Sequence, residues 1–247
     1  MRYYGIISDI HGNLPALQAA ADHLAKNQIE KIVVLGDLVG YGAEPGACID
    51  TVRGIKNAVV ISGNHDRGVV GPDDPNLRET AAEGIRWTRS VLTESQKKYL
   101  TELPTAWLVD NLFFAVHGSL YNPDEYIITS RVANKNMKLL RERFLTVRVA
   151  FFGHSHVPML ISEEGMRTGF RETNLTVELN PKRHYLINPG AVGQPRDGDP
   201  RVSFIIFDIF RWAVTFVRVA YDVERAQQAI RFVGMPEESA GRLKLGL

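Results

Sequence analysis

Cysteine is almost absent from this sequence, and so are long apolar runs. The 247 residues include one cysteine, Cys48, so a disulfide within one chain is impossible. A metal site would therefore use His, Asp, Asn or Glu side chains. No apolar run approaches the roughly 18 residues of a membrane-spanning helix. The first residues, MRYYGIISDIHG, lack the length and the flanks of a signal peptide, so we expect a cytoplasmic protein without a membrane partner.

Net charge is also nearly absent. With 29 Lys and Arg against 28 Asp and Glu, the formal net charge is +1, which gives no long-range field to favour nucleic acid. The length allows one large domain or two small ones. Because no change in composition marks a boundary, we expect a single domain over residues 1–235 and a loosely held C-terminal tail over residues 236–247.

The sequence does contain apolar runs that end in polar residues. The segment Lys31–Gly42, KIVVLGDLVGYG, is typical of a buried strand that ends just before Asp37. Two further runs end at Asp9 and Asn64, at intervals that match the length of a βαβ repeat. We therefore expect a parallel sheet with these side chains at one end, where ligands bind in α/β proteins. A carboxylate buried there is costly without a cationic partner.

The alternation of strand and helix is interrupted twice along the chain. Residues from about 74 to 103 carry two helical patterns, and the second begins with a capping box at Thr93 and Gln96. We interpret this pair as a helical excursion that covers the polar strand ends. After Pro158 the apolar runs follow one another with little helix between them, which is typical of antiparallel strands. We expect these strands to form much of a second sheet.

Five of the seven histidines lie in glycine-flanked clusters directly after apolar runs. They are His11, His65, His117, His154 and His156. Any one of them alone would be interpreted as a cap or a surface residue. Together they indicate side chains from several strands that converge at one edge, and imidazole with carboxylate is a ligand set for borderline divalent metals.

These clusters, taken in order, form a known signature. The blocks are DIH at 9–11, GDLVGYG at 36–42, GNHD at 63–66, HG at 117–118 and GHSH at 153–156. They resemble the ordered signature of the calcineurin-like metallophosphoesterases over the chain from Tyr3 to about Val202. Residues 188–201, NPGAVGQPRDGDPR, resemble the small phosphodiesterase branch of bacteria and archaea, which includes proteins similar to diadenosine-polyphosphate hydrolases. Gly40 and Tyr41 stand where Ser/Thr protein phosphatases of this superfamily carry an Asp-Arg pair, which argues against that activity.

The resemblance implies a fold and a metal centre. The fold is α/β, a four-layer α/β/β/α sandwich of two mixed sheets flanked by helices. The implied cofactors are two divalent ions, Mn, Fe or Zn, that activate a bridging hydroxide. The ligands of the first ion would be Asp9, His11, Asp37 and His156. Those of the second would be Asp37, Asn64, His117 and His154, with Asp37 as the bridge.

The resemblance also implies roles for side chains near the metals. His65 is expected to face the substrate and to protonate the leaving oxygen. Asp66 is expected to orient that imidazole, with a loop cap as the alternative. Arg196 is expected to bind phosphate, with a solvated turn residue as the alternative, and the neutral oxygen of Asn64 leaves room for an anionic substrate. For Tyr41, which adjoins a ligand position, the sequence favours a structural role.

The expected function is metal-dependent hydrolysis of a phosphate ester. The leading candidate is a phosphodiesterase that acts on a nucleotide or a small phosphoester. A dinucleoside-polyphosphate hydrolase and a nuclease are the alternatives, and the near-zero net charge counts against the nuclease. A non-catalytic metal-binding scaffold is a further alternative, against which the presence of His65 argues. Pairing of the late strands across an interface would allow a homo-oligomer.

Overall fold

The structure, a computed structural model, describes residues 2–75, 77–144 and 146–247. The strands are β1 Tyr3–Ile7, β2 Lys31–Val34, β3 Val59–Val60, β4 Ala106–Val109, β5 Phe113–Val116, β6 Val149–Phe151, β7 Met159–Ser162, β8 Gly165–Thr168, β9 Asn174–Glu178, β10 Tyr185–Asn188, β11 Val202–Asp208 and β12 Ala213–Val219. The helices are α1 Leu14–Lys26, α2 Pro45–Gly54, α3 Asn64–Val70, α4 Glu79–Val91, α5 Glu94–Glu102, α6 Ser130–Arg143, α7 Val223–Phe232 and α8 Glu237–Leu245.

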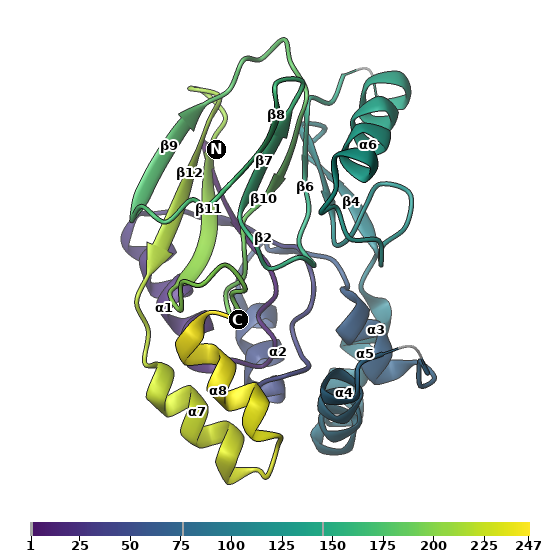
Figure 1. Cartoon of the computed structure of the whole chain (residues 1–247), viewed down its shortest axis with the longest axis vertical. Coiled ribbons are helices and arrows are strands. Elements are labelled where there is room, and N and C mark those ends of the chain that lie inside the picture. The colour runs from purple at the N-terminus through teal and green to yellow at the C-terminus, as the bar shows by residue number, and fades with distance from the viewer. Residues whose placement is uncertain (1, 76, 145) are drawn as a thin grey trace.

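The strands form two mixed six-stranded sheets (Figure 1). The first sheet has the order β3-β2-β1-β11-β12-β9, and β1, β2 and β3 run parallel in it. This confirms the parallel arrangement that the spacing of the polar clusters predicts. In the second sheet, β4-β5-β6-β10-β7-β8, the strand β6 is parallel to both of its neighbours. The carboxyl ends of β1, β2, β5 and β6 lead into the polar clusters.

The expectation for the strands after Pro158 is only half right. Three of them, β7, β8 and β10, lie in the second sheet, but β9, β11 and β12 extend the first one. β11 pairs antiparallel with β1, and β12 and β9 add outward from it. The inward faces of β11 and β12, with Phe207 and Phe216, pack in the same core as the second sheet. An apolar face of this kind does not reveal which of two facing sheets a strand joins.

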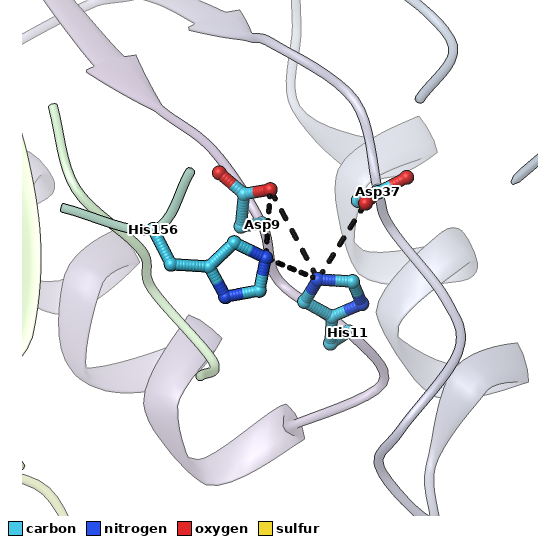
Figure 2. Close-up of side chains that lie close together, drawn as sticks. All are labelled: Asp9, His11, Asp37 and His156. Carbon is cyan, nitrogen blue, oxygen red and sulfur yellow. Dashed lines mark hydrogen bonds and ion pairs between the residues drawn. The ribbon is translucent and has the colours of Figure 1, made fainter. Parts of the chain in front are cut away.

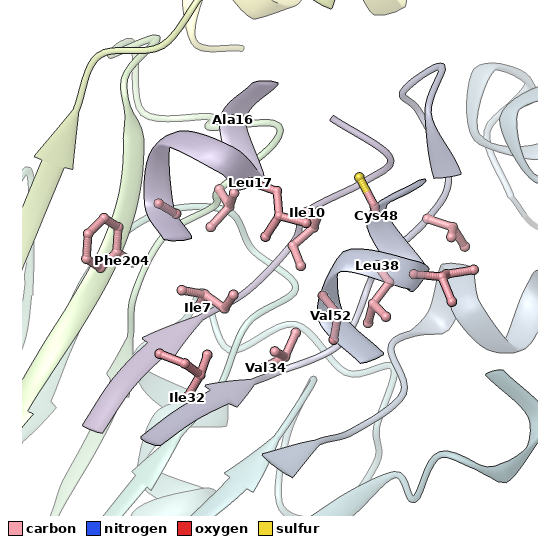
Figure 3. Packing of buried hydrophobic residues seen from close by; sticks show 14 of the residues in the cluster. Ile7, Ile10, Ala16, Leu17, Ile32, Val34, Leu38, Cys48, Val52 and Phe204 are labelled. Carbon is pink, nitrogen blue, oxygen red and sulfur yellow. The ribbon is translucent and has the colours of Figure 1, made fainter. Parts of the chain in front are cut away.

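Three apolar layers hold the elements together. Between the sheets lies a core that includes Tyr4, Phe113, Phe151 and Phe207. On the outer face of the first sheet, α1 and α2 pack through residues such as Leu17 (Figure 3). On the outer face of the second sheet, α6 covers another cluster. The result is the predicted α/β/β/α sandwich.

The predicted helical excursion is present as α4 and α5. The capping box that starts α5 is formed, since Gln96 N donates to Thr93 Oγ1 at 3.3 Å and Thr93 N donates to Gln96 Oε1 at 3.1 Å. The short helix α3, which the sequence patterns do not indicate, begins at Asn64 and packs against both. Among the described residues, no helix combines the length and the apolar character needed to cross a bilayer.

The C-terminal residues are not the loosely held tail that the sequence suggests. They form α8, which packs against α7 and buries Ala240 and Leu243. Gln227 Nε2 donates to the carbonyl of Ala240 at 2.8 Å, and Gly198 N donates to the carbonyl of Gly246 at 2.9 Å. A helix this short offers too few turns for its periodicity to stand out, and its stability comes from this packing.

Candidate metal centre

The polar clusters converge where the two sheets meet. Asp9 follows β1 and Asp37 follows β2, both in the first sheet. His117 follows β5 and His154 follows β6, both in the second sheet. These side chains are all nearly inaccessible to solvent. The site is therefore assembled from both sheets, and neither sheet alone supplies it.

One group consists of Asp9, His11, Asp37 and His156, whose ligand atoms all lie within 4.8 Å of one another (Figure 2). His11 Nε2 is 3.5 Å from Asp37 Oδ2, and His156 Nε2 is 3.4 Å from Asp9 Oδ1. The two Nε2 atoms of His11 and His156 are 3.1 Å apart. Four potential donor atoms thus surround a small volume.

A second group consists of Asp37, His117 and His154. His117 Nε2 is 3.3 Å from Asp37 Oδ2 and 3.1 Å from Asn64 Oδ1. Asn64 opens α3, so its side chain is carried to the site by the first turn of that helix. Asp37 belongs to both groups, as a bridging carboxylate would.

Each of the four clustered imidazoles uses one ring nitrogen on a backbone carbonyl. His11 Nδ1 is 3.1 Å from Val39 O, and His156 Nδ1 is 2.6 Å from Gln194 O. His117 Nδ1 and His154 Nε2 contact the carbonyls of Leu35 and Asp124 at 2.7 and 3.1 Å. A carbonyl only accepts, so each of these nitrogens carries a proton. The pKa values of His11, His154 and His156 are lowered by burial, so these rings are neutral and their other nitrogen is a bare acceptor. Metal-binding histidines are held in this way.

The backbone at the site is strained. Left-handed φ angles of 50 to 67° occur at Asp9, His11, Asp37, His154 and His156. Such a conformation costs about 1–2 kcal/mol for a residue with a Cβ, and strain of this kind gathers at functional sites. The backbone of Gly63 approaches the Asp37 carboxylate so closely that a Cβ at this position would lie 2.0 Å from Asp37 Oδ1. A residue with a side chain would therefore displace Asp37.

The buried charges favour a cation. Burial acts to raise the pKa of Asp37, yet the neighbouring His117 and His65 hold it well below its usual range. Burial alone would lower the pKa of His117, but the charge of Asp37 raises it to about 9. Burial raises the pKa of Asp9 to about 7. Oxygen and nitrogen donors around an anionic carboxylate fit divalent ions of the borderline class.

His65 lies beside these groups without taking part in either. Its ring centroid is 4.8 Å from that of His11, and its buried Nδ1 has no hydrogen-bond partner among the residues that the structure describes. Burial lowers its pKa, and the charge of Asp37 opposes this shift. The backbone N–H of His65 donates to Asp37 Oδ1 at 2.9 Å. The imidazole is thus adjacent to the cluster and free to meet a substrate.

Asp66 does not orient His65 in this structure. Its Oδ1 accepts from the backbone N–H of Leu38 at 2.8 Å and of Val39 at 3.3 Å. Its Oδ2 accepts from the N–H of Gly63 at 2.9 Å. The carboxylate therefore ties the loop after Asp37 to the start of α3, which is the loop cap that the sequence left as the alternative.

Arg196 lies at the edge of the cluster. Its Nη2 donates to Gln194 Oε1 at 2.9 Å, and its guanidinium is 5.8 Å from the centroid of the Tyr41 ring. Its buried Nε has no hydrogen-bond partner in the described part of the chain. Its charge acts to lower the pKa of His156, after the larger effect of burial. An arginine with unused donors beside a metal-binding cluster fits an anionic substrate.

The sequence did not indicate two residues of the site. Tyr126 stacks on the ring of His154 with centroids 3.7 Å apart, and Gln194 contacts both His156 and Arg196. Gln194 lies within the segment 188–201, which the resemblance singled out. Tyr126 lies in an irregular loop without a motif, so no signal in the sequence marked it.

Comparison with known proteins assigns the family. The sequence profile of the calcineurin-like phosphoesterase superfamily domain matches residues 1–211. An uncharacterized protein from Methanocaldococcus jannaschii is 36% identical over 251 residues, which cover 98% of this chain and 97% of that protein. The chain therefore belongs to the calcineurin-like phosphoesterase superfamily. Together with the Asp and His clusters, this membership indicates a metal-dependent hydrolase.

Two further comparisons agree with this assignment. The crystal structure of a metallophosphoesterase from Sphaerobacter thermophilus has a TM-score of 0.86 at 35% identity, covering 100% of this chain and 99% of that one. The phosphodiesterase YfcE of Escherichia coli is 24% identical over 202 residues, which cover 78% of this chain and 80% of that protein. The resemblance found in the motifs is confirmed.

Proposed function

We propose that the protein hydrolyses phosphate esters with two divalent metal ions, as a phosphodiesterase of a nucleotide or a small phosphoester. The observation that carries the proposal is the pair of bare Nε2 atoms of His11 and His156, 3.1 Å apart in a buried site. Two acceptors facing each other beside carboxylates are favourable only around a cation. The shared position of Asp37 supports a second cation next to the first.

The proposed ligands follow the two groups. Asp9, His11, Asp37 and His156 would hold one ion, and Asp37, Asn64, His117 and His154 the other. When bound, such a pair of ions polarises a phosphoryl oxygen and activates water for in-line attack. Asn64 supplies a neutral oxygen, so the site is less negative than a carboxylate there would make it. Mn, Fe and Zn all suit these ligands.

Two side chains at the edge would act on the substrate. Arg196 would bind the phosphate, because its buried Nε lacks a partner among residues 2–75, 77–144 and 146–247 and its planar guanidinium matches two phosphate oxygens. His65 would donate a hydrogen bond or a proton to the leaving oxygen, because no group of the described residues forms a hydrogen bond with its Nδ1. Asp66 would act only by shaping the loop.

The net charge of the chain and its similarity to known proteins narrow the class of substrate. The name of the relative YfcE supports a phosphodiesterase. The resemblance of residues 188–201 to proteins similar to diadenosine-polyphosphate hydrolases keeps a dinucleoside polyphosphate as the second candidate. A net charge of +1 gives a nuclease little support. The position of His65 beside the cluster argues against a scaffold without catalysis.

A substrate panel tests the proposal. Metal-stripped protein receives Mn, Fe or Zn in turn and is then assayed with p-nitrophenyl phosphate, its bis-ester, cyclic nucleotides and diadenosine tetraphosphate. We expect hydrolysis that requires metal and favours the diesters. If the protein binds two ions per chain and hydrolyses none of these compounds, the proposed function is wrong.

Replacement of His65 separates chemistry from metal binding. His65→Ala should retain both ions and lose roughly 10²–10⁴ in kcat, since the imidazole acts on the substrate and is no ligand. Metal content by elemental analysis and turnover are measured together. The matched control is His23→Ala, which removes a histidine that packs on Phe204 outside the cluster. Loss of metal from His65→Ala would contradict the assigned role.

A further inference from the structure

Tyr126 is placed over the metal centre with part of its ring open to solvent. One face stacks on the His154 ring at a centroid distance of 3.7 Å and an interplanar angle of 26°. The residue is nevertheless 44% exposed. Because His154 covers one face of the ring, a further group would approach the ring from its opposite face or its edge. An aromatic face left open beside a reaction centre can receive a planar group.

The loop that carries Tyr126 is well anchored. Ser119 Oγ donates to Glu125 Oε2 at 2.6 Å, and Asp124 forms an ion pair with Arg67. The carbonyl of Asp124 also contacts His154 Nε2 at 3.1 Å. The ring is therefore fixed before any substrate arrives, which lowers the entropic cost of binding on it.

Arg196 lies near Tyr126 and beside Tyr41. Burial raises the pKa of Tyr126, and the charge of Arg196 opposes this shift. The Arg196 guanidinium lies 5.8 Å from the Tyr41 ring centroid. Tyr41 in turn contacts the rings of His11 and His65, with centroids 4.9 and 4.7 Å apart. The cation that would hold a phosphate is thus close enough to Tyr126 to act on its hydroxyl.

We propose that Tyr126 is a stacking platform for a nucleobase next to the phosphate, so that the site selects nucleoside phosphoesters over alkyl ones. This inference rests on the proposed function, because it places the phosphate at Arg196 and the metals. Stacking of a base on an aromatic side chain contributes about 1–3 kcal/mol, which corresponds to roughly 5- to 150-fold in affinity. The platform would act on substrate affinity and leave the chemistry unchanged.

The test compares two diesters with the same leaving group, thymidine 5′-(p-nitrophenyl phosphate) and methyl p-nitrophenyl phosphate. Tyr126→Leu should raise KM for the thymidine ester about tenfold and leave the methyl ester within about twofold. Tyr126→Phe, which keeps the ring, should behave like the parent protein for both. Equal losses on both substrates, or none, would overturn the proposal.

Binding measurements separate this inference from the proposed function. Metal-loaded protein is titrated calorimetrically with adenosine monophosphate and with inorganic phosphate. The nucleotide should bind more tightly, and Tyr126→Leu should remove that difference, whether or not any ester is hydrolysed. The control is Tyr121→Ala, since this similarly exposed tyrosine of the same loop contacts Lys135 at 4.1 Å instead of the centre. If the parent protein binds adenosine monophosphate and inorganic phosphate with equal affinity, the stacking role of Tyr126 is disproved, but the proposed hydrolysis of phosphate esters is not.

Discussion

At the scale of single residues, Asp37 is the most important side chain of the proposed metal centre. Its carboxylate lies 3.5 Å from His11 Nε2 and 3.3 Å from His117 Nε2, so it faces both groups of side chains. It also accepts a hydrogen bond from the backbone of His65 at 2.9 Å. A residue in this position belongs to both groups of proposed ligands.

Asp37→Asn should therefore weaken both metal sites together. The amide keeps the size of the side chain but removes the negative charge that both ions would share. Elemental analysis of the purified variant should find clearly fewer than the two ions proposed for the parent protein. The control is Asp50→Asn, which alters an exposed carboxylate of α2, 3.8 Å from Arg53 and outside the cluster, and should leave the metal content unchanged. Two ions per chain in Asp37→Asn would rule out the bridge.

Residues were predictable where their chemistry is local. Polar clusters after apolar runs identified Asp9, His117 and the other clustered side chains, because strand ends and glycines can be recognised in the sequence itself. Asp66 could not be interpreted correctly, because its partners are amides of a loop 27 and 28 positions away. Tyr126 could not be found, because stacking on His154 depends on how two loops meet.

At the scale of elements, α8 is the clearest departure from the sequence-based expectation. Leu243 is 4% exposed in the cluster shared with α7, whereas Leu245 is 58% exposed. The helix holds the segment that bears Arg196 through the bond between Gly198 N and Gly246 O. Its contribution is therefore to both stability and the edge of the site.

Leu243→Ala should destabilise the protein by about 2–4 kcal/mol, because it leaves a cavity between α7 and α8. Leu245→Ala, the same substitution on the exposed side of the helix, should change stability by less than about 0.5 kcal/mol. Chemical denaturation of both variants gives the comparison. Similar midpoints for the two would mean that α8 is held as weakly as the sequence suggests.

The same segment contains a pH-sensitive contact. Burial acts to raise the pKa of Asp199, but hydrogen bonds from Arg201 outweigh it and hold the pKa below its usual value. The folded state therefore favours the ionised form of Asp199. This preference stabilises the folded protein at pH values above the usual aspartate pKa of about 3.9. This contribution is lost as the pH falls through the lowered value.

Asp199→Asn should accordingly cost about 1.5 kcal/mol at neutral pH, and the difference from the parent protein should shrink once the pH falls below about 3.9. Denaturation midpoints measured across that range reveal the trend. Glu178→Gln, which alters an exposed carboxylate 3.5 Å from Arg211, is the control and should show almost no effect at any pH. A difference that persists at low pH would contradict the assignment.

Elements were predictable where a pattern is long and repeated. The parallel strands of the first sheet followed from regular spacing, and the helix from Glu94 followed from its capping box. The short elements α3, α8 and β8 carry too few residues to show a period. The allocation of β11 and β12 to the first sheet depends on tertiary pairing that neither strand encodes alone.

At the scale of the whole molecule, the metal centre and the sheets have separate sources of stability. The sheets are held by three apolar layers. The strained ligand residues, in contrast, all lie in loops at one edge. The ions proposed there would offset the repulsion among the clustered side chains.

Removal of metal should therefore loosen this edge while the sandwich stays folded. Chelation should lower the unfolding temperature, since metal at 100 times its dissociation constant contributes about 2.7 kcal/mol. Hydrogen exchange should accelerate in the loops that bear Asp9, Asp37 and His154, and stay slow in the strands. Global unfolding on chelation would show that the apolar layers alone do not hold the fold.

The origin of the ligands in two facing sheets has a further consequence. Asp9 and Asp37 follow strands of one sheet, and His117 and His154 follow strands of the other. The thickness of the layer between them, filled by Phe113, Phe151 and Phe207, thus acts as a spacer that sets how far apart the two halves of the reaction centre stand. Adding or removing one methyl group in that layer would therefore shift the two sets of ligands relative to each other and lower the activity, while the protein still folds.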